Sequence, residues 1–422
     1  MSTSTTAPRL GLPSTATSRL WSLRVRATRQ IVKRAARDVP VDVALPDGSL
    51  LNRPSPDGET RPRIDLHRPE SFFRRLAEQP KVGVGEAYTA GDWSAADGSD
   101  LADVLAPYAA RLTNLLPAWL LRLRRLVDQP IPADQEGARE HTQANVAAHY
   151  DLSNEMFAAF LDESLTYSSA LFYDDRPLAD QDLTTAQLRK VNAALDEAGV
   201  GSGTELLEIG TGWGTLAIEA ARRGARVTTV TLSVEQAALA LRRIEDAGLT
   251  HLVTVLVQDY RDVTGQFDAV VSIEMIEAVG ERYWPEFFAT LSRVLRPGGA
   301  IALQAIVMSH ERYLTTRRSY GWIQKHIFPG GLIPSLDAIA SHADAVGLTV
   351  EHTHHFGRHY AETLRRWRAT FLENWPMIRA ARFGEEFRRT WEFYLAYCEA
   401  GFRTGYLDVA QVRLVPTTRT AA

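Results

Sequence analysis

The chain has 422 residues, enough for two domains, and its 45% hydrophobic content is ordinary for a globular protein. A single cysteine excludes a disulfide scaffold, and the lack of a secretory signal or a long apolar span argues against secretion and membrane spanning and indicates the cytoplasm. The formal net charge of −4 conceals a basic start, because residues 1–37 hold eight basic residues and no acidic one.

Two kinds of sequence make up this basic start. Residues 1–18 are rich in serine, threonine and proline, a composition that predicts disorder. Residues 19–37 can form a basic amphipathic helix that suits the anionic inner face of a membrane, which predicts peripheral membrane association. A solvated helix that packs on its own protein is an equal alternative. A nucleic-acid partner is not expected, since no recognised binding module accompanies the charge.

The next segment predicts a smaller N-terminal accessory domain, residues 38–128, that associates with lipid or membrane. Its densest stretch of turn and aromatic residues is "GVGEAYTAGDW" at 83–93. An apolar, basic helix is expected at 116–127, and it is too short to span a bilayer. Residues 129–141 are predicted to be a linker to a catalytic domain that occupies residues 142–422.

A glycine-rich loop lies in "LLEIGTGWGTLAIEA", residues 206–220. The apolar run before it predicts a buried strand and the run after it a helix, so Gly210, Gly212 and Gly214 form the connection. Glycines let a ligand approach the backbone, and the helix start offers free N–H groups. The dinucleotide fingerprint G-x-G-x-x-G is not met, and Thr231 stands where an acidic residue would hold a ribose. The E-x-G-x-G-x-G pattern instead resembles motif I of S-adenosylmethionine-dependent methyltransferases.

Strand and helix signals alternate through the rest of this region. A third strand is predicted to end at Asp259 and Tyr260, and another strand lies in "FDAVVSIEMIEAVG". An amphipathic helix follows, then a turn centred on Pro297 and Gly298, then a buried strand. The alternation predicts an α/β fold with a doubly wound parallel sheet, and the methyltransferase resemblance implies seven strands in a Rossmann-like order. The apolar face of the helix is formed by Phe287, Phe288, Leu291, Val294 and Leu295.

The segment before the sheet makes the resemblance specific. "VAAHYDLSNEMFAAFLDESLTYSSALF", residues 146–172, resembles the signature of the cyclopropane-fatty-acyl-phospholipid synthase family, which includes mycolic acid methyltransferases. The similarity continues collinearly through "TLSVEQ", "MIEAVG", "WIQKHIFPGGLIPS" and "YLAYCEAGFRTGYLDV" and covers most of residues 150–412. It implies a C-methyltransferase that acts on the cis double bond of unsaturated phospholipid acyl chains. It also implies a helical lipid-binding cap inserted at about residues 307–347.

The resemblance implies S-adenosylmethionine as the cofactor. Gly212 and Gly214 would let the cofactor lie on backbone, while Glu208, Thr231 and Gln236 can hydrogen-bond its polar groups. The positions that fall where the family binds this cofactor are Tyr167, Ser168, Leu206, Leu207, Glu208, Ile209, Gly210, Thr211, Gly212, Trp213, Gly214, Thr231, Leu232, Ser233, Gln236, Asp259, Tyr260 and Arg261.

Relatives remove a proton with a bound bicarbonate, whose ligands align with Ser169, Glu277, Gln304, Ile306 and Tyr360. Two of these residues depart from the family, because Ser169 stands where cysteine is usual and Gln304 where histidine is usual. Glu274 adds a carboxylate where glycine is common. A neutral amide cannot exchange a proton at neutral pH, so the role of bicarbonate is in question. We expect Glu277 first, and Glu274 second, to replace it as the proton acceptor.

The position of the base affects which product forms. Proton loss from the newly added methyl before any rearrangement closes a cyclopropane, whereas a preceding hydride shift leads to a methylene branch. The altered base site favours the methylene product, and the pattern resembles actinobacterial members whose methylene fatty acids are reduced by a flavin-dependent partner. A cyclopropane synthase is the alternative, followed by a small-molecule methyltransferase and a non-catalytic cofactor-binding subunit. The oligomeric state is left open.

Other residues have plainer interpretations. Cys398 falls at a family cysteine and joins the candidate catalytic residues, although an inert buried thiol explains it as well. The histidines of residues 352–359 lack the context of a metal site, so no metal is expected. Aromatic faces can stabilise a cation without capturing it, and six are available for that lining. They are Tyr167, Phe172, Tyr320, Trp322, Phe328 and Tyr360.

Overall fold

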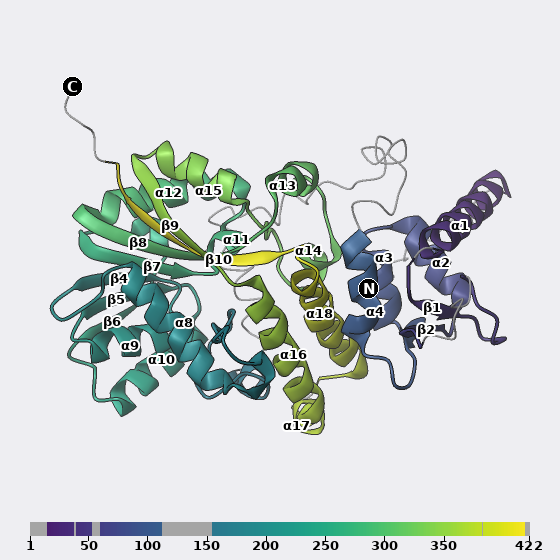
Figure 1. The fold of residues 1–422 in the computed structure, drawn as a ribbon, viewed down its shortest axis with the longest axis horizontal. Coiled ribbons are helices and arrows are strands. Elements are labelled where there is room, and N and C mark those ends of the chain that lie inside the picture. Colours follow the sequence, from purple (N-terminus) through teal and green to yellow (C-terminus); the bar gives the residue numbers. More distant parts are fainter. Residues whose placement is uncertain (1–14, 38, 53–59, 112–153, 382, 418–422) are drawn as a thin grey trace, which may run out of the picture. The chain divides into compact units, whose positions relative to one another are not determined.

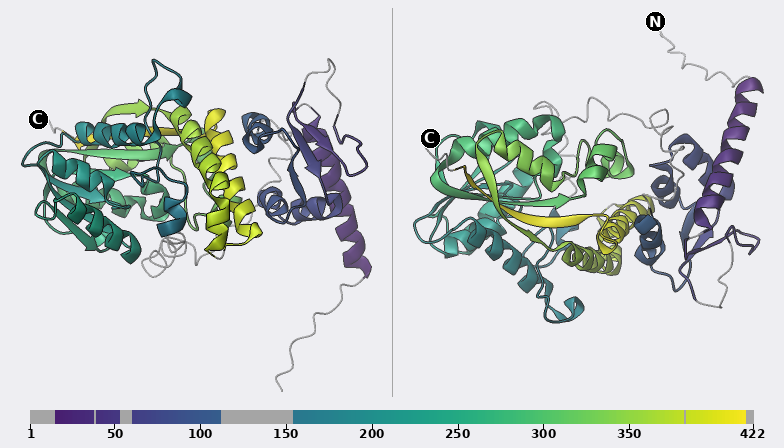
Figure 2. Two further views of the ribbon diagram at one scale, coloured as in Figure 1. Left: turned by 90° about the horizontal axis from the view of Figure 1, so that it is seen from below. Right: turned by 45° about the horizontal axis from the view of Figure 1, so that its top comes forward.

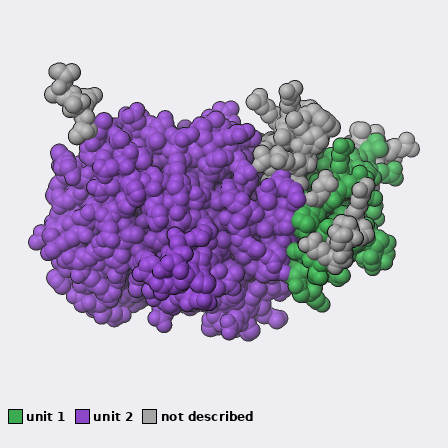
Figure 3. All heavy atoms as spheres, in the orientation of Figure 1, with its two compact units in different colours: residues 1–99 green, residues 100–422 purple. Residues whose placement is uncertain are grey.

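The structure is a computed structural model that describes residues 15–37, 39–52, 60–111, 154–381 and 383–417 (Figure 1). The chain divides into two compact units, Met1–Ser99 and Asp100–Ala422 (Figure 3). The division falls earlier than the domain end predicted at residue 128, because α4 (Leu101–Arg111) packs on α18 (Glu385–Arg403). The helix predicted at 116–127 and the linker predicted at 129–141 lie outside the described residues.

The first unit combines a small sheet with helices. Its described elements are α1 (Thr15–Ala36), β1 (Asp42–Ala44), β2 (Arg63–Leu66), α2 (Pro69–Glu78), α3 (Gly83–Thr89) and β3 (Trp93–Ala95). The sheet order is β1-β2-β3, with β1 parallel and β3 antiparallel to β2. Helix α1 confirms the predicted basic helix and begins inside the segment predicted to be disordered. Gly83 admits close packing of α3, since a Cβ there would lie 2.5 Å from the carbonyl oxygen of Arg75.

The second unit is built on a seven-stranded sheet with the order β6-β5-β4-β7-β8-β10-β9. All neighbours pair in parallel except β10, which is antiparallel to both β8 and β9. This topology confirms the predicted doubly wound α/β fold. The strands are β4 (Glu205–Ile209), β5 (Arg226–Thr231), β6 (Val253–Val257), β7 (Phe267–Ile273), β8 (Leu295–Val307), β9 (Leu348–His355) and β10 (Asp408–Pro416).

Two predicted strand boundaries are wrong. Strand β6 ends at Val257, because Asp259 caps the short helix η4 (Tyr260–Asp262) by accepting a backbone N–H, a local bond that competes with strand pairing. Strand β8 continues through Pro297 and Gly298, where the sequence predicts a turn. The irregularity appears there as a register shift in the pairing of β8 with β7 and as a φ of +81° at Gly298.

Helices cover both faces of this sheet (Figure 1). Alternate residues of β8 enter different cores: Ile301 and Leu303 pack with α12 (Trp284–Val294), whereas Ala302 packs on the face of α8 (Leu183–Glu197). The residues of the predicted apolar face are all buried, although Leu295 begins β8 instead of ending α12, and each such side chain contributes about 1.5–3 kcal/mol on burial. Further elements of this unit are α7 (Asn154–Ala158), η3 (Leu178–Asp180), α9 (Thr215–Arg222), α10 (Val234–Asp246), α11 (Ile276–Val279) and η5 (Glu281–Tyr283).

The insertion predicted at about 307–347 contains α13 (His310–Thr316), α14 (Trp322–His326) and α15 (Leu336–Asp344). Helix α15 packs against β9 and α12, so it covers a face of the sheet. Lipid binding by the other two helices stays a prediction. Within the described ranges, no helix combines the length and the apolar character needed to cross a membrane.

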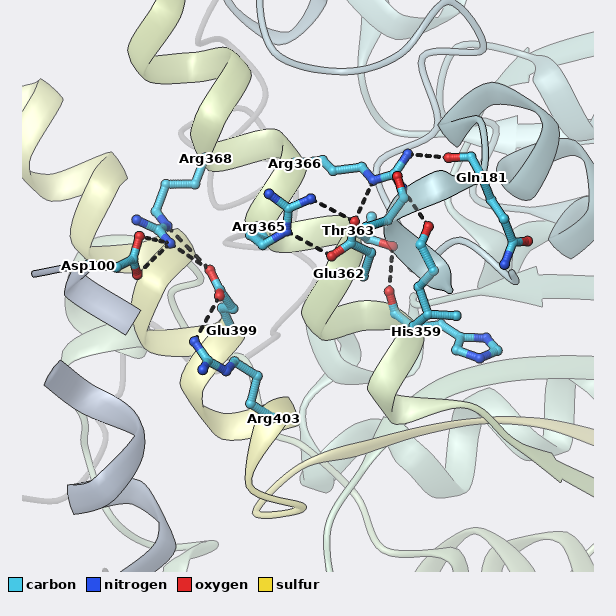
Figure 4. Close-up of polar contacts among 12 residues, drawn as sticks. Asp100, Gln181, His359, Glu362, Thr363, Arg365, Arg366, Arg368, Glu399 and Arg403 are labelled. Atoms are coloured by element: carbon cyan, nitrogen blue, oxygen red, sulfur yellow. Dashed lines mark hydrogen bonds and ion pairs between the residues drawn. The ribbon is translucent and has the colours of Figure 1, made fainter. Parts of the chain in front are cut away.

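Three helices lie between β9 and β10, namely α16 (Gly357–Glu373), α17 (Trp375–Ala380) and α18. Helices α16 and α18 run side by side (Figure 2). Arg368 of α16 joins them, since its guanidinium donates to Glu399 of α18 at 3.0 Å and to Asp100 at 2.8 Å (Figure 4). Arg366, two residues earlier, donates to the Gln181 carbonyl at 2.6 Å and ties α16 to the loop before α8 (Figure 4). These contacts fix the helix that carries Tyr360.

Candidate active site

The three glycines between β4 and α9 are needed for two different reasons. All have positive φ, of +101° at Gly210, +51° at Gly212 and +88° at Gly214. A Cβ at Gly210 would lie 2.7 Å from Met275 Cγ, and one at Gly214 would lie 3.1 Å from Ala240 Cβ. Around Gly212 no atom lies within 4 Å of that direction. Packing therefore demands the first and third glycines, and only the middle one faces open space where a ligand could lie on the backbone.

Glu208 offers an unused acceptor at the end of the same strand. Its side chain is buried, and Oε2 has no hydrogen-bond partner within the described chain. Burial raises the pKa of Glu208 to about 8, against the opposing effects of the Thr229 hydroxyl and the Lys190 charge. A buried polar atom without a partner calls for one that the polypeptide does not provide. The hydroxyl and ammonium donors of S-adenosylmethionine fit this requirement.

Other residues predicted to bind the cofactor form hydrogen bonds or ion pairs with one another. Ser233 caps α10 by accepting the Gln236 N–H at 3.2 Å, and the Thr231 hydroxyl donates to Gln236 Oε1 at 3.1 Å. Arg261 pairs with Asp259 at 2.6 Å. These bonds shape the carboxyl ends of β5, which lies beside β4, and of β6, the next strand, but none of them alone indicates a ligand. Leu206 and Leu207 lie within β4 and belong to the hydrophobic core. The remaining positions, near these strand ends, are the buried Ile209, Thr211, Trp213 and Tyr260 and the partly buried Leu232.

A second cluster gathers around the carboxylate of Glu274. Oε1 accepts the Ser169 backbone N–H at 2.9 Å and the Gln304 side-chain amide at 2.8 Å, and Oε2 accepts the Tyr360 hydroxyl at 2.8 Å. The backbone of Glu274 also donates to the Gln304 carbonyl at 2.8 Å. Its φ is +51°, a left-handed conformation that costs a side-chain-bearing residue about 1–3 kcal/mol. Three separate segments of the chain thus bring donors to one carboxylate.

Glu277, three residues later, is held differently. Its Oε1 accepts the Ile306 backbone N–H at 2.5 Å, while Oε2 is buried without a partner in the described residues. The five positions that the family resemblance assigns to bicarbonate are therefore brought together. Three of them donate to Glu274, and the other two, Glu277 and Ile306, bind each other.

The two carboxyl groups differ in the stabilisation of their charge. Burial raises the pKa of both, to about 8 for Glu277, where the neighbouring Glu274 charge adds to the effect. For Glu274 the Lys190 charge and the three hydrogen bonds oppose the rise. Both residues are partly buried. Glu274 is accordingly the better anion and Glu277 the better proton carrier.

Aromatic rings surround this cluster. Tyr360 packs on Phe402 with ring centroids 4.5 Å apart and on Trp367 at 6.1 Å. Tyr167, a predicted cofactor residue, lies 5.3 Å from Trp367 and shares a 2.8 Å hydrogen bond with the hydroxyl of Tyr394. Of the other rings named from the sequence, Phe172 packs on His359, Trp322 on Phe393 and Phe328 on Tyr394, while Tyr320 is buried.

Cys398 and the histidines contribute less. Burial raises the pKa of Cys398 to about 12, so the thiol stays protonated at neutral pH, which favours the interpretation as an inert residue. His352, His355 and His359 each contact a carboxylate on a different partner, at 2.7–2.9 Å. The described residues contain no group of three or more potential ligands arranged to hold a metal ion.

Three polar residues of the site were not predicted from the sequence. Lys190 and Gln187 of α8 are fully buried, and both bind Ser168: Lys190 Nζ donates to its Oγ at 2.5 Å and Gln187 to its carbonyl at 2.9 Å. Gln411 of β10 donates to Gln304 Oε1 at 3.0 Å and orients that amide toward Glu274. The sequence signal for Lys190 and Gln187 was the placement of a lysine and a glutamine on the apolar stripe of an amphipathic helix, where a charged residue rarely lies without a partner.

Comparison with known proteins finds relatives in the family that the sequence resembles. The family model for mycolic acid cyclopropane synthetase matches residues 138–412. The tuberculostearic acid methyltransferase UfaA1 of Mycobacterium tuberculosis is 46% identical over 390 residues, which cover 92% of this chain and 90% of that protein. The cyclopropane-fatty-acyl-phospholipid synthase of Escherichia coli is 33% identical over 88% of this chain and 94% of its own. The mycolic acid cyclopropane synthase CmaA1, in complex with SAH and CTAB, superposes with a TM-score of 0.59 and 32% identity, covering 64% of this chain and 97% of that one.

The open space at Gly212 predicts the effect of filling it. Gly212→Val should weaken S-adenosylmethionine binding at least about 100-fold, since the branched side chain would occupy the ligand space and strain the backbone. Gly248→Val is the matched control, because Gly248 has a φ of +72° and open surroundings in the loop after α10. Isothermal titration calorimetry measures both. A folded Gly212→Val variant with wild-type affinity would refute the loop assignment.

The raised pKa of Glu277 predicts a pH-dependent stability. The folded protein keeps a proton that the unfolded chain releases above about pH 4.5, so this contribution is full below that pH and is lost as pH rises toward 8. Glutamine cannot ionise. Glu277→Gln should therefore change the melting temperature little at pH 5 and raise it at pH 8.5. Thermal unfolding across this range tests the expectation, and an equal difference at both pH values would contradict it.

Proposed function

The chain belongs to the mycolic acid cyclopropane synthetase family, and we propose from that membership that it methylates the cis double bond of unsaturated phospholipid acyl chains and leaves a methylene branch. It is an S-adenosylmethionine-dependent methyltransferase of the fatty-acyl kind. The 46% identity to a tuberculostearic acid methyltransferase supports the branched product over a ring.

The protein has to meet three requirements in this reaction, which follow from its chemical steps. Bound S-adenosylmethionine supplies an electrophilic methyl group. Transfer of this methyl group to one alkene carbon leaves a cation on the other alkene carbon. A hydride then shifts from the methylated carbon to the cationic carbon, so that the cation comes to lie on the methylated carbon. Loss of a proton from the new methyl then forms the methylene. The protein must align the alkene, keep water from the cation and place a base near the methyl. The rings around Tyr360 can line the cation's site without capturing it.

The observation that carries this proposal is the position of the Glu274 carboxylate. It occupies the donors of Ser169, Gln304 and Tyr360, where the family resemblance assigns bicarbonate. A second anion on the same donors would be repelled. Glu274 is therefore the general base that accepts the proton, and the enzyme works without bicarbonate. This reverses the preference for Glu277 that the sequence suggested.

A cyclopropane synthase is the second candidate, and one observation favours it. Ile306 and Tyr360, which the resemblance aligns with bicarbonate ligands, still point a backbone N–H and a hydroxyl into this cluster. Both groups are, however, occupied by carboxylates of the chain itself. A methylene product also implies a consumer, and a flavin-dependent reductase is the proposed partner for its reduction to a methyl branch.

Helix α1 is proposed to hold the enzyme at an anionic membrane surface on the inner side. Leu23 is 58% exposed and Ile31 41% exposed, and exposed basic residues including Arg26, Lys33 and Arg34 accompany them. Exposed apolar side chains among cations suit insertion at the boundary of head groups and acyl chains. Each basic residue near such a surface adds about 1 kcal/mol of attraction.

The product decides between the two candidate functions. The purified protein should convert labelled S-adenosylmethionine and liposomes of cis-unsaturated phospholipid into methylene-branched acyl chains. Gas chromatography with mass detection of the methyl esters identifies them. A mainly cyclopropane product would establish the second candidate, and transfer to small molecules alone would remove the lipid substrate.

Removing the Glu274 carboxylate should create a requirement for bicarbonate. Glu274→Gly relieves the positive φ and empties the donors of Ser169, Gln304 and Tyr360, so turnover should fall about 10²–10⁴-fold and recover on addition of bicarbonate. Leu165→Gly is the control, because Leu165 has a φ of +52° but no carboxylate, and it should gain no bicarbonate response. An active Glu274→Gly variant without added anion would exclude Glu274 as the base.

Deletion of residues 1–37 should weaken sedimentation with anionic vesicles more than with neutral ones. The double variant Leu23→Ser/Ile31→Ser keeps every charge and should lose only the apolar part of the binding. Equal sedimentation of the full-length and truncated proteins with anionic vesicles would leave α1 as a solvated helix.

A further inference from the structure

Lys190 has no role in the function described so far, yet it is one of the most buried residues of the chain. It lies on α8 with none of its surface exposed, and Nζ donates to the Ser168 hydroxyl at 2.5 Å. A lysine ammonium is strongly hydrated in water, so full burial is unfavourable unless opposite charge compensates it. The question is which charge does so.

Two sets of contacts, one from the Lys190 ammonium and one from its backbone carbonyl, connect this residue with the surroundings of Glu274. Ser168, which Lys190 contacts, precedes Ser169, whose N–H binds the Glu274 carboxylate at 2.9 Å. Gln411 donates both to the Lys190 carbonyl and to Gln304 Oε1, each at 3.0 Å, and the Gln304 amide donates to Glu274 at 2.8 Å. The lysine and the carboxylate thus belong to one buried network that α8, β8 and β10 hold together.

We infer that Lys190 is the positioning residue that keeps Glu274 ionised, as its buried counter-charge, so that Glu274 can accept the proton in the reaction. The inference rests on the proposed function, since it concerns the base of that reaction. Lys190 itself touches no reacting atom. Its effect is electrostatic and passes through Glu274.

The charges around both groups agree with this assignment. Glu274, Asp162 and Glu208 all act on Lys190 in opposition to its burial, and Glu274 exerts the largest of these effects. Glu274 in turn faces Lys190, Glu277 and Tyr360, and among them only Lys190 carries a positive charge. Without Lys190 the buried carboxylate would keep hydrogen bonds but no counter-charge, and it would bind a proton more tightly.

The pH profile of a single turnover separates this role from a structural one. Lys190→Met keeps an unbranched side chain one atom shorter and removes the charge, so the acid limb of the rate should move to higher pH by about one to three units. Gln187→Leu is the matched control, since Gln187 is equally buried one turn away and also binds Ser168. It should leave the acid limb in place. An unshifted limb in Lys190→Met, or an equal shift in Gln187→Leu, would overturn the inference.

A stability cycle gives a readout that does not need activity. Lys190→Met leaves the Glu274 charge buried alone and should lower the melting temperature, while Lys190→Met/Glu274→Gln removes both charges and should recover part of the loss. Additive effects would contradict a direct charge interaction. Full turnover by the Glu274→Gln variant would contradict the proposed function itself. If Glu274→Gln is inactive but the pH profile of Lys190→Met is unshifted, only the role of Lys190 is contradicted.

Discussion

A carboxylate buried at the carboxyl end of the sheet is the constraint on which the site depends. Glu274 can be accommodated there only because separate segments bring donors to it: the loop of Ser169, strand β8 with Gln304, and helix α16 with Tyr360. Its left-handed backbone conformation shows that the fold tolerates local strain to place it. Helix α8 supplies the buried Lys190 to the same network.

This arrangement ties the proton acceptor to the polypeptide. A bound anion can leave, and its supply depends on solution conditions, whereas a side chain stays at one position and one distance from the substrate. Because the base is fixed, the position of the bound acyl chain decides which proton the base removes and therefore which product forms. The unused acceptor of Glu208 and the open backbone at Gly212 lie at the neighbouring strand ends, as a methyl donor close to this base requires.

Much of this could be predicted from local sequence and the rest could not. The β4–loop–α9 unit and the buried face of α12 follow from short-range periodicity and glycine placement, and both were correctly predicted. The choice between Glu274 and Glu277 depends on donors up to about 100 residues away in sequence, such as Ser169 and Ile306, which no local pattern reveals. The role of Lys190 was invisible for the same reason. The early end of β6 depends on one aspartate side chain that caps η4.

The most direct test of this account is the dependence of the wild-type rate on bicarbonate. Turnover of S-adenosylmethionine on unsaturated phospholipid vesicles would be followed in buffer freed of carbon dioxide and then with increasing bicarbonate at constant pH and ionic strength. Because Glu274 already occupies the donors, we expect a high rate without bicarbonate and a flat response to its addition. A rate near zero that rises to saturation with bicarbonate would show that the base is the anion, and that the Glu274 carboxylate does not replace it.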